Sequence, residues 1–509
     1  MAGSIHALAV VGTGVMGTGI AQIAAQAGLT VRLFDARDGA AGAARDGLVA
    51  TLRTLADKGK IGADAAAEAA SRLHVAGSLS DLAECALVVE AIVERLEPKR
   101  ALLAALEDVV GETCILATNT SSLSVTAIAR AARHPERVAG FHFFNPVPLM
   151  RVVEVVDGLA TSTAVGDALV SLAGRMGHRA VRATDTPGFV VNHAGRAYGT
   201  EALKMLGESV ASCGDIDRIL REAAGFRMGP FELFDLTGLD VSHPVMESIY
   251  EQFYQEPRYR PSALTRQMLE GGRIGRKAGH GFYRYRDGKP VDPPQPQPVP
   301  AVDTLPPVWI GAETDADRDA VRARLVGLGA SVEAGPAPSA DALCLLAPYG
   351  HDATTACRLH GTDPRRTLCL DLLPGLDRHR TLMVTPATGA PFRDAAHALL
   401  ARDGTGVTVV SDSVGFVVQR TLAAVVNLAC DIAQQGIARV EDIDDAVRLG
   451  LGYPHGPLAW GDALGPERLH TILTRLLATT GDPRYRPSPW LRRRAQLGLS
   501  LREPGSSPA

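Results

Sequence analysis

The stretch Gly12-Thr-Gly14-Val-Met-Gly17 directly follows a short apolar run, Ala7–Val11, and opens a segment with helical periodicity. In a turn from strand to helix, the first glycine of this spacing permits the tight turn, and the second lets a pyrophosphate approach the backbone. The third allows close packing between helix and strand, and the helix N-terminus supplies amide donors to the phosphates. The stretch therefore predicts a dinucleotide-binding α/β domain of the Rossmann type.

An acidic residue supports this interpretation and indicates which dinucleotide binds. Asp35 follows the next apolar run, Thr30 to Phe34, and lies 18 residues after Gly17. A carboxylate at that place accepts hydrogen bonds from an adenosine ribose and disfavours a 2′-phosphate, which favours NAD over NADP. Arg37 lies close enough to weaken that preference. The alternative interpretation is a structural turn followed by a surface aspartate.

The pattern along the chain divides it into six segments. Short apolar runs alternate with helical segments up to residue 185, which predicts a parallel sheet covered by helices on both faces. We expect a Rossmann domain (1–185), an all-helical domain (186–286), a proline-rich linker (287–307), a second strand–helix alternation without a glycine fingerprint (308–405), a second helical domain (406–501) and a tail (502–509). The eight prolines from Pro290 to Pro307 favour an extended polyproline II spacer.

The two helical segments repeat each other at a constant offset of 227 residues. Three pairs of stretches match: Asp185-Thr-Pro-Gly-Phe-Val-Val-Asn192 with Asp412-Ser-Val-Gly-Phe-Val-Val-Gln419, Asp215-Ile-Asp217 with Asp442-Ile-Asp444, and Gly225-Phe-Arg-Met-Gly-Pro230 with Gly452-Tyr-Pro-His-Gly-Pro457. An internal repeat of this kind indicates a duplicated structural unit. We therefore expect a duplicated helical domain, and we interpret residues 308–405 as a degenerate Rossmann-like domain.

Composition excludes several other classes of protein. A length of 509 residues predicts about three or four domains. With 46% hydrophobic residues and a net charge of −4, the chain is globular and not built mainly to bind nucleic acid or an anionic membrane. No apolar run reaches the ~18 residues of a membrane span, and residues 1–11 do not resemble a secretory signal. The seven cysteines lack metal-ligand spacing, so we expect reduced thiols, no metal and a cytoplasmic location.

A histidine and a carboxylate in apolar surroundings form the strongest catalytic candidate. His142 ends an apolar strand within Gly140-Phe-His-Phe-Phe-Asn145-Pro, and Glu154 lies twelve residues later within Val152–Val156. A carboxylate in an apolar run is costly unless it is paired. Pairing with His142 would orient the imidazole and stabilise its protonated form, as a general base needs. Alone, the histidine could equally be a satisfied core residue.

Two further polar positions follow predicted strands. Asn119-Thr-Ser121-Ser122 comes just after a strand, where an open α/β sheet binds its ligands. Asn192 lies in the first turns of a helix, after the Pro-Gly break that ends another strand. Both could hydrogen-bond a substrate. Each could also be an ordinary helix cap or surface residue.

Taken together, these motifs resemble those of the L-3-hydroxyacyl-CoA dehydrogenase family. The resemblance also includes Val-Val-Glu-Ala-Ile-Val-Glu94 and Gly229-Pro-Phe-Glu232. It runs almost continuously from residue 5 to about 285 and returns, more weakly, over residues 410–498. It implies an enzyme that oxidises an (S)-3-hydroxyacyl-CoA to the 3-ketoacyl-CoA, with NAD as the cofactor.

The resemblance also implies roles for individual residues. His142 corresponds to the catalytic base, Glu154 to the carboxylate that holds it, Ser121 to the residue that binds the substrate C3 oxygen, and Asn192 to a residue that positions the substrate. Cofactor binding falls to Gly12, Gly14, Gly17, Asp35, Glu94, Lys99, Ser121 and Asn145. Coenzyme A contacts fall to Thr51 and Lys58, and Thr51 stands where the family pattern has a serine.

The second half departs from the family pattern. Gln419 takes the place of Asn192, and we expect the segment Arg380 to Pro391 to stand where the first half has its His-Phe-Phe-Asn-Pro stretch. That segment lacks the histidine, so we interpret residues 308–509 as a non-catalytic copy. By analogy with relatives that pair through their helical domains, the expected state is either a homodimer or a monomer whose two helical domains pair in cis.

The layout favours one substrate without deciding it. Length, linker and tandem helical domain resemble family members of phenylacetate degradation, which act on 3-hydroxyadipyl-CoA; a 3-hydroxybutyryl-CoA enzyme is the alternative. A distal carboxylate would need a cation, and Arg196, Lys204 and Arg227 are candidates by position. Two other possibilities are a non-catalytic NAD-binding structural protein and a dehydrogenase for a free hydroxy acid.

Overall fold

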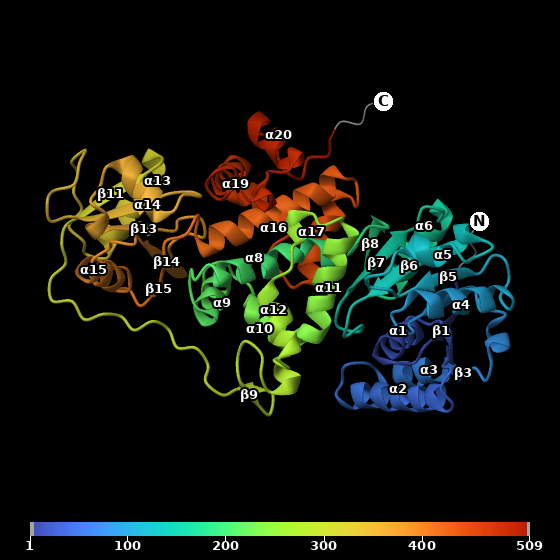
Figure 1. Ribbon diagram of the computed structural model, residues 1–509. Coiled ribbons are helices and arrows are strands. Elements are labelled where there is room, and N and C mark those ends of the chain that lie inside the picture. The colour runs from blue at the N-terminus through green and yellow to red at the C-terminus, as the bar shows by residue number, and fades with distance from the viewer. Residues whose placement is uncertain (1–4, 506–509) are drawn as a thin grey trace. The chain divides into compact units, whose positions relative to one another are not determined.

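The computed structural model describes residues 5–505, which form two compact units (Figure 1). The first unit comprises the chain up to His193 together with Gln435–Gly452. The second comprises Ala194–Gln434 and the chain from Tyr453 on. Part of the second helical segment therefore belongs with the first domain. The six-segment division of the chain stays a prediction, and the last residues of its tail, 506–509, lie outside the described range.

The first unit contains a sheet of eight strands in the order β3-β2-β1-β4-β5-β6-β7-β8. Neighbouring strands are parallel except β6 and β7, which are antiparallel. The strand order 3-2-1-4-5-6 is that of a Rossmann domain, as the sequence predicted. The strands are β1 (Ala7–Val11), β2 (Thr30–Phe34), β3 (Leu73–Val75), β4 (Leu87–Glu90), β5 (Ile115–Thr118), β6 (Val138–Phe143), β7 (Val152–Asp157) and β8 (Arg179–Thr184).

Helices cover both faces of this sheet. Strand β1 shows why, because Leu8 and Val10 belong to one apolar core and Ala9 and Val11 to a second one. Alternate side chains of a strand point to opposite faces, so a fully apolar strand needs cover on each side. The helices of this unit are α1 (Val15–Gln26), α2 (Ala40–Asp57), α3 (Ala63–Ser71), α4 (Leu96–Glu107), α5 (Val125–Ala129), α6 (Thr163–Arg175), α7 (Val191–Ala194) and α17 (Val440–Gly450).

The second unit contains the remaining helices and a smaller sheet. Helix α16 (Val417–Gln434) is buried along nearly its whole length and packs against α8, α9, α18, α19 and α20. The other helices of the two repeats are α8 (Arg196–Gly207), α9 (Cys213–Glu222), α10 (Pro230–Thr237), α11 (Leu239–Gln252), α12 (Ala263–Glu270), α18 (Pro457–Leu464), α19 (Pro466–Thr480) and α20 (Pro489–Leu497). A helical domain therefore follows the Rossmann domain, as predicted.

The smaller sheet repeats part of the first one. Its strands are β11 (Val308–Ala312), β12 (Leu343–Ala347), β13 (Thr367–Leu370), β14 (His379–Val384) and β15 (Gly406–Val410). They lie in sequence order, and only β13 and β14 are antiparallel neighbours. The same pattern occurs in β4 to β8. Helices α13 (Asp315–Gly327), α14 (Ala353–His360) and α15 (Ala390–Leu400) accompany this sheet.

This correspondence explains one prediction and corrects another. The glycine fingerprint follows β1, and this five-strand sheet contains no counterparts of β1 to β3, so it has no place for the fingerprint. Strands β7 and β14 start 227 residues apart, as do β8 and β15. The segment Arg380 to Pro391 therefore does not replace the His-Phe-Phe-Asn-Pro stretch, and that expectation was wrong. The counterpart of His142 is Cys369 in β13.

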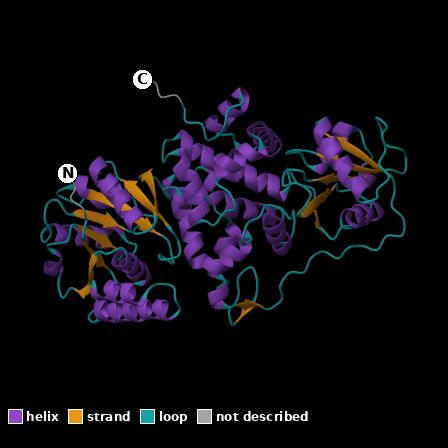
Figure 2. Cartoon of the chain, turned by 180° about the vertical axis from the view of Figure 1, so that it is seen from behind, coloured by secondary structure: helices purple, strands orange, loops and turns teal. Residues whose placement is uncertain are grey.

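The linker contains little regular structure. A two-stranded hairpin, β9 (Tyr285–Arg286) with β10 (Lys289–Pro290), precedes it. From residue 291 to 307 the chain forms no helix or strand, and Figure 2 shows it as one long loop. Proline removes the backbone donor that either structure needs, which accounts for the extended course. Among residues 5–505, no helix has the length and apolar character to cross a membrane.

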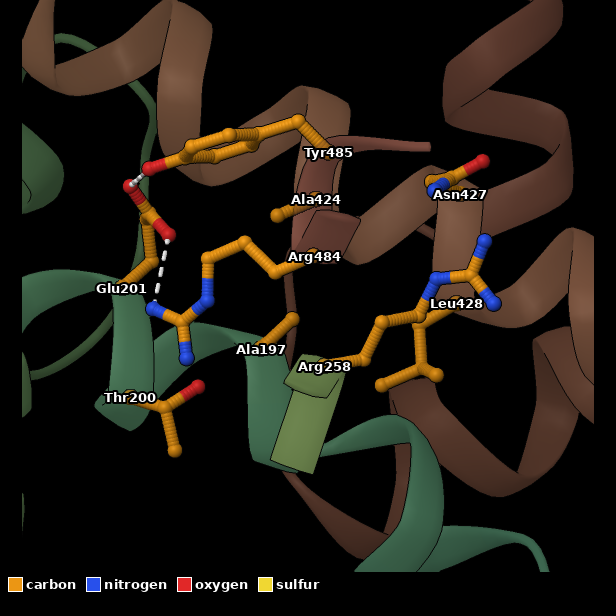
Figure 3. Close-up of a pocket in the computed structure, with 9 residues that line it drawn as sticks. All are labelled: Ala197, Thr200, Glu201, Arg258, Ala424, Asn427, Leu428, Arg484 and Tyr485. Carbon is orange, nitrogen blue, oxygen red and sulfur yellow. Dashed lines mark hydrogen bonds and ion pairs between the residues drawn. The ribbon is translucent and has the colours of Figure 1, made fainter. Parts of the chain in front are cut away.

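The two helical repeats exchange polar contacts within the second unit. Figure 3 shows Glu201 of α8 bound to the hydroxyl of Tyr485, at 2.7 Å, and to the guanidinium of Arg484. Tyr485 and Arg484 belong to the second repeat. In the opposite sense, Asp431 of α16 forms an ion pair with Arg258 of the first repeat. Because each repeat supplies the carboxylate for the other's arginine, the repeats interlock.

Candidate active site

A buried histidine–glutamate pair lies at the centre of the first unit. His142 and Glu154 are direct cross-strand neighbours on β6 and β7, and Nδ1 lies 2.7 Å from Oε2. The second carboxylate oxygen, Oε1, accepts the backbone N–H groups of Val190, at 2.9 Å, and Val191, at 2.8 Å. Glu154 has no exposed surface. A carboxylate accepts only, so Nδ1 carries the proton and leaves Nε2 as the acceptor that a general base requires.

A left-handed turn delivers the two amides to Glu154. Gly188 and Phe189 have φ values of 75° and 48°, and the glycine makes the first of these conformations cheap. Asp185 anchors the start of the turn, because its carboxylate accepts the Ser124 hydroxyl at 2.7 Å and the Thr126 N–H at 2.7 Å. The Asp-Thr-Pro-Gly-Phe motif therefore holds the carboxylate, a role that sequence reasoning did not assign to it.

The glycine-rich turn has the shape that dinucleotide binding requires. A Cβ on Gly17 would lie 1.9 Å from the carbonyl oxygen of Gly12, so only glycine allows this approach of helix and strand. Gly12 itself has a φ of 95°. Around Gly14, by contrast, a Cβ would meet no atom within 4 Å, which leaves room for a ligand. The three predicted roles of the glycines agree with this geometry.

Asp35 is held in place beside the turn. Its Oδ2 accepts the N–H of Thr13 at 2.9 Å and the Thr13 hydroxyl at 2.8 Å. The Arg37 guanidinium, with Nε 3.1 Å from Oδ1, and these Thr13 bonds hold the pKa of Asp35 well below its usual range. Asp35 is therefore an anion that only accepts hydrogen bonds, which suits a ribose diol.

A second polar cluster lies after β4 and β5. Glu94 Oε1 accepts the N–H of Ser121 at 2.8 Å and of Ser122 at 3.1 Å, and the Thr120 hydroxyl at 2.7 Å. Burial alone would raise the pKa of Glu94, but Lys99 and these hydrogen bonds lower it below its usual value. Ser121 and Glu94 thus lie together, as expected of neighbours in one site.

Lys99 connects this cluster to a residue that sequence reasoning missed. Its ammonium lies 2.8 Å from Glu90 Oε1 and 3.3 Å from Glu94 Oε2, and it is almost completely buried. Glu90 ends strand β4 within the motif that also contains Glu94. A glutamate inside an apolar strand was the available signal, because such a charge needs a buried cation. Lys99 therefore orients Glu94 from below the site.

A pocket of about 520 Å³ lies between α1, α2 and the loop after β6. Thr51 of α2 and Asn145 of the loop both line it. Asn119, at the end of β5, fixes the start of this loop region by accepting the Phe143 N–H at 2.8 Å. Lys58 lies at the exposed C-terminal end of α2 and is not among the lining residues. Two predicted ligand-binding residues thus share one cavity.

The comparisons with known proteins decide the family. Residues 7–186 match the NAD-binding domain of 3-hydroxyacyl-CoA dehydrogenases, and residues 188–285 and 415–507 both match the C-terminal domain of the same enzymes. The chain belongs to the 3-hydroxyacyl-CoA dehydrogenase family. The double match also confirms that the helical domain is duplicated.

Similar proteins include full-length and half-length relatives. A 3-hydroxyadipyl-CoA dehydrogenase of Escherichia coli K12 is 38% identical over 97% of this chain and 98% of its own. A crystal structure of a 3-hydroxybutyryl-CoA dehydrogenase from the same species has a TM-score of 0.84, with 37% identity, and covers 97% of this chain and 98% of that one. Human mitochondrial hydroxyacyl-coenzyme A dehydrogenase is 38% identical over 54% of this chain and 90% of its own.

In this dehydrogenase, the remaining predicted residues have different surroundings. Asn192 lies half-buried in α7, directly after the amides that bind Glu154. In the second unit, Lys204 pairs with Glu208 at 3.0 Å and with Asp482 at 3.4 Å. Burial lowers the pKa of Arg196 to about 10, and Arg227 is exposed.

The second half of the dehydrogenase has no equivalent acid–base pair. At the offset of 227, Cys369 and Thr381 stand for His142 and Glu154. Gln419, the counterpart of Asn192, is fully buried, and its amide nitrogen binds Asp371 Oδ1 at 2.9 Å. Its oxygen accepts the Gly350 N–H at 2.7 Å. The protein itself thus satisfies the side chain that would otherwise face a ligand.

Proposed function

We propose that this dehydrogenase oxidises the 3-hydroxyl group of 3-hydroxyadipyl-CoA, with His142 as the general base. The observation that carries the proposal is the buried His142–Glu154 pair, in which both carboxylate oxygens have partners and the imidazole Nε2 is left to accept a proton. NAD, when bound, accepts the hydride that leaves C3.

The chain's own residues move and stabilise the proton. His142 Nε2 takes the proton of the substrate hydroxyl while the C3–H bond breaks, which leaves a ketone on the substrate and an imidazolium on the protein. The Glu154 carboxylate stabilises that imidazolium through Nδ1. Proton transfer by a positioned base contributes about 10²–10⁴-fold to a rate. Reversal uses the imidazolium as the acid.

The other predicted residues complete the site. Ser121 would bind the C3 oxygen, and Asn192 would position the substrate. Gly12, Gly14, Gly17 and Asp35 would hold the adenosine and pyrophosphate parts of NAD, and Glu94, Lys99 and Asn145 the nicotinamide-ribose side. Thr51 and Lys58 would contact coenzyme A. In support, Ser121 binds Glu94 and Thr51 shares a pocket with Asn145.

The relatives support the adipyl substrate through their names. The nearly full-length E. coli relative is named for 3-hydroxyadipyl-CoA, whereas the full-length crystal structure is named for 3-hydroxybutyryl-CoA. 3-Hydroxybutyryl-CoA is therefore the second candidate. Lys204 already pairs with two carboxylates, so Arg196 and Arg227 are preferred as the cation for a distal carboxylate.

The second half would serve as a non-catalytic partner in cis. It lacks the acid–base pair, its sheet corresponds to β4–β8 alone, and its helices interlock with those of the first repeat. In this proposal, residues 308–405 are a degenerate Rossmann-like domain. The helical repeats replace the pairing of two subunits in a cytoplasmic protein that is a monomer or a homodimer of such chains.

The experiment compares two thioesters under identical conditions. NADH formation is measured with 3-hydroxyadipyl-CoA and 3-hydroxybutyryl-CoA, and with the free hydroxy acids. A higher kcat/KM for the adipyl thioester supports the proposal, and a higher value for the butyryl thioester replaces it with the second candidate. Turnover of the free acids alone would exclude the coenzyme A contacts, and no turnover at all would favour a structural NAD-binding protein.

A further inference from the structure

A segment of the second helical repeat completes the catalytic sheet. Strand β8 is the edge strand of that sheet, and its outer side pairs with residues just before α17. The Thr184 N–H donates to the Ile437 oxygen at 2.9 Å, and Ala183 and Ala438 form an antiparallel bridge. These residues lie immediately before the turn that supplies two amides to Glu154. The second repeat therefore borders the device that holds the catalytic carboxylate.

An ion-pair cluster fixes the other end of β8 to the same helix. Arg179, the first residue of β8, lies 2.7 Å from Asp442 Oδ1 through Nη2 and 2.8 Å from Asp445 Oδ2 through Nε. Asp442 is almost fully buried. Burial alone would raise the pKa of Asp445, but Arg179 and Arg448 lower it below its usual value. Both ends of β8 are thus attached to α17 and the residues before it.

The last residue of α17 touches the carboxylate holder itself. A Cβ on Gly450 would lie 2.9 Å and 3.0 Å from the two methyl groups of Val191, and 3.5 Å from Val152 Cγ1. The Val191 N–H donates to Glu154, and Val152 lies two residues before Glu154 on the same strand. Gly450 is therefore in contact with the supports on both sides of the carboxylate.

We propose that the Ile437–Gly450 segment positions Glu154, and hence His142, with Gly450 as the critical contact. Valine has one strongly preferred side-chain rotamer in a helix, and close-packed interiors leave no void to absorb an added methyl group. A methyl group at residue 450 would consequently push the Val191 backbone away from Glu154. The inference rests on the proposed function, since it adds a positioning residue to the same reaction.

The other repeat supplies an internal comparison. There the Ser411 N–H donates to the Val210 oxygen at 2.9 Å, and α9 packs on β14, so the same docking occurs at the same offset. The counterpart of Gly450 in that repeat is Ala223. The docking as such thus tolerates a methyl group. Glycine stands at this position only in the copy that docks beside the Glu154 carboxylate.

The first test is Gly450→Ala in the full-length protein. We expect kcat to fall by about tenfold or more, because displacement of a catalytic group by roughly 1 Å can cost up to ~10²-fold. The Kd for NAD should stay unchanged, since none of the cofactor glycines contacts residue 450. Gly174→Ala, in α6, is the matched control, because a Cβ there would meet no atom within 4 Å.

A compensating change separates positioning from simple damage. Adding Val191→Ala to Gly450→Ala removes the collision and should restore most of the lost kcat, whereas general destabilisation would persist. An unchanged kcat in Gly450→Ala, or a loss that Val191→Ala does not reverse, overturns the proposal. Inactivity of the unmodified protein would instead refute the proposed function.

A milder variant covers the case in which Gly450→Ala does not fold. Asp442→Asn with Asp445→Asn weakens the attachment of β8 without adding volume, and Glu441→Gln is the control because Glu441 is an exposed acid of the same helix. A lower kcat in the double variant, with the control unchanged, supports the proposal. Equal kcat values in both overturn it.

Discussion

The two sheets of this dehydrogenase share one strand pattern and differ in chemistry. In the first sheet, the antiparallel neighbours β6 and β7 carry His142 and Glu154, whereas β13 and β14 carry Cys369 and Thr381 at the equivalent places. Both sheets keep buried apolar strands and dock a helix from the opposite repeat. The comparison shows that packing and catalysis depend on separate residues, so a copy can lose one and retain the other.

The largest expected effect comes from exchanging the two copies' roles at the histidine. His142→Ala should lower kcat by about 10²–10⁴-fold, because the base that receives the hydroxyl proton is removed. Binding of NAD, measured by fluorescence titration, should remain. Cys369→Ala is the matched change in the second sheet and should leave kcat unaltered. Near-normal turnover by His142→Ala would remove the basis for calling the first copy catalytic.

The carboxylate position should give the next largest effect. Glu154→Gln places a neutral amide next to the imidazole and loses the stabilisation of the imidazolium, so kcat should fall by about 10²-fold. Thr381→Val is its counterpart, and the Thr381 hydroxyl has no hydrogen-bond partner in the described structure. That change should leave kcat unaltered. Equal losses in the two variants would contradict the division of labour between the sheets.

The second copy should reveal itself through stability rather than turnover. Burial raises the pKa of Asp371, which binds Gln419, to about 6, above the model value of 3.8. The folded state therefore holds this proton more tightly than the unfolded chain, and stability decreases as the pH rises from about 4 to 6. We expect the protein to be about 1 kcal/mol more stable at pH 5 than at pH 7 on account of this group.

Asp371→Asn isolates that contribution from other titrating groups. Urea unfolding of both proteins at pH 5 and pH 7 gives the difference between them. The wild type should gain about 1 kcal/mol more than the variant on acidification. Identical pH dependence in the two proteins would show that Asp371 is ionised in the folded state.

The smallest expected effect concerns the acyl group. The second copy has Ala423 and Pro454 where the first has Arg196 and Arg227. Replacing these arginines separately with glutamine should, for one of them, lower kcat/KM for 3-hydroxyadipyl-CoA by about fivefold, as an ion pair of up to ~1 kcal/mol implies. The value for 3-hydroxybutyryl-CoA should not change. Lys204→Gln serves as the control, and unchanged selectivity in all three variants would exclude both arginines.

Local patterns of the first half could be predicted from the sequence because each requires a particular residue type. A Gly-x-Gly-x-x-Gly turn requires glycines for steric reasons, and a carboxylate in an apolar strand requires a partner, so the turn and the His142–Glu154 pair both followed. The burial of Lys99 between two glutamates did not, since lysine is usually exposed. Its location depends on strand order, which short motifs do not encode.

The second half was harder to interpret for a related reason. Its strands contain no polar marker that corresponds to the His-Phe-Phe-Asn-Pro stretch, so residues 380–391 were matched to the wrong strand. The constant offset of 227 gives the right answer once it is extended from the helices to β13–β15. The docking of α17 on β8 could not be predicted, because its apolar face fits either sheet as far as the sequence shows.

The cover on β8 also affects how the protein is made. An unpaired edge strand offers its backbone groups to other chains, and domains at the N-terminus usually fold first during synthesis. Here the edge of the catalytic sheet stays open until the ribosome has added Ile437 and the helix that ends at Gly450. Most of the chain must emerge before the first domain is complete, so that interval is when the nascent protein most needs protection from aggregation.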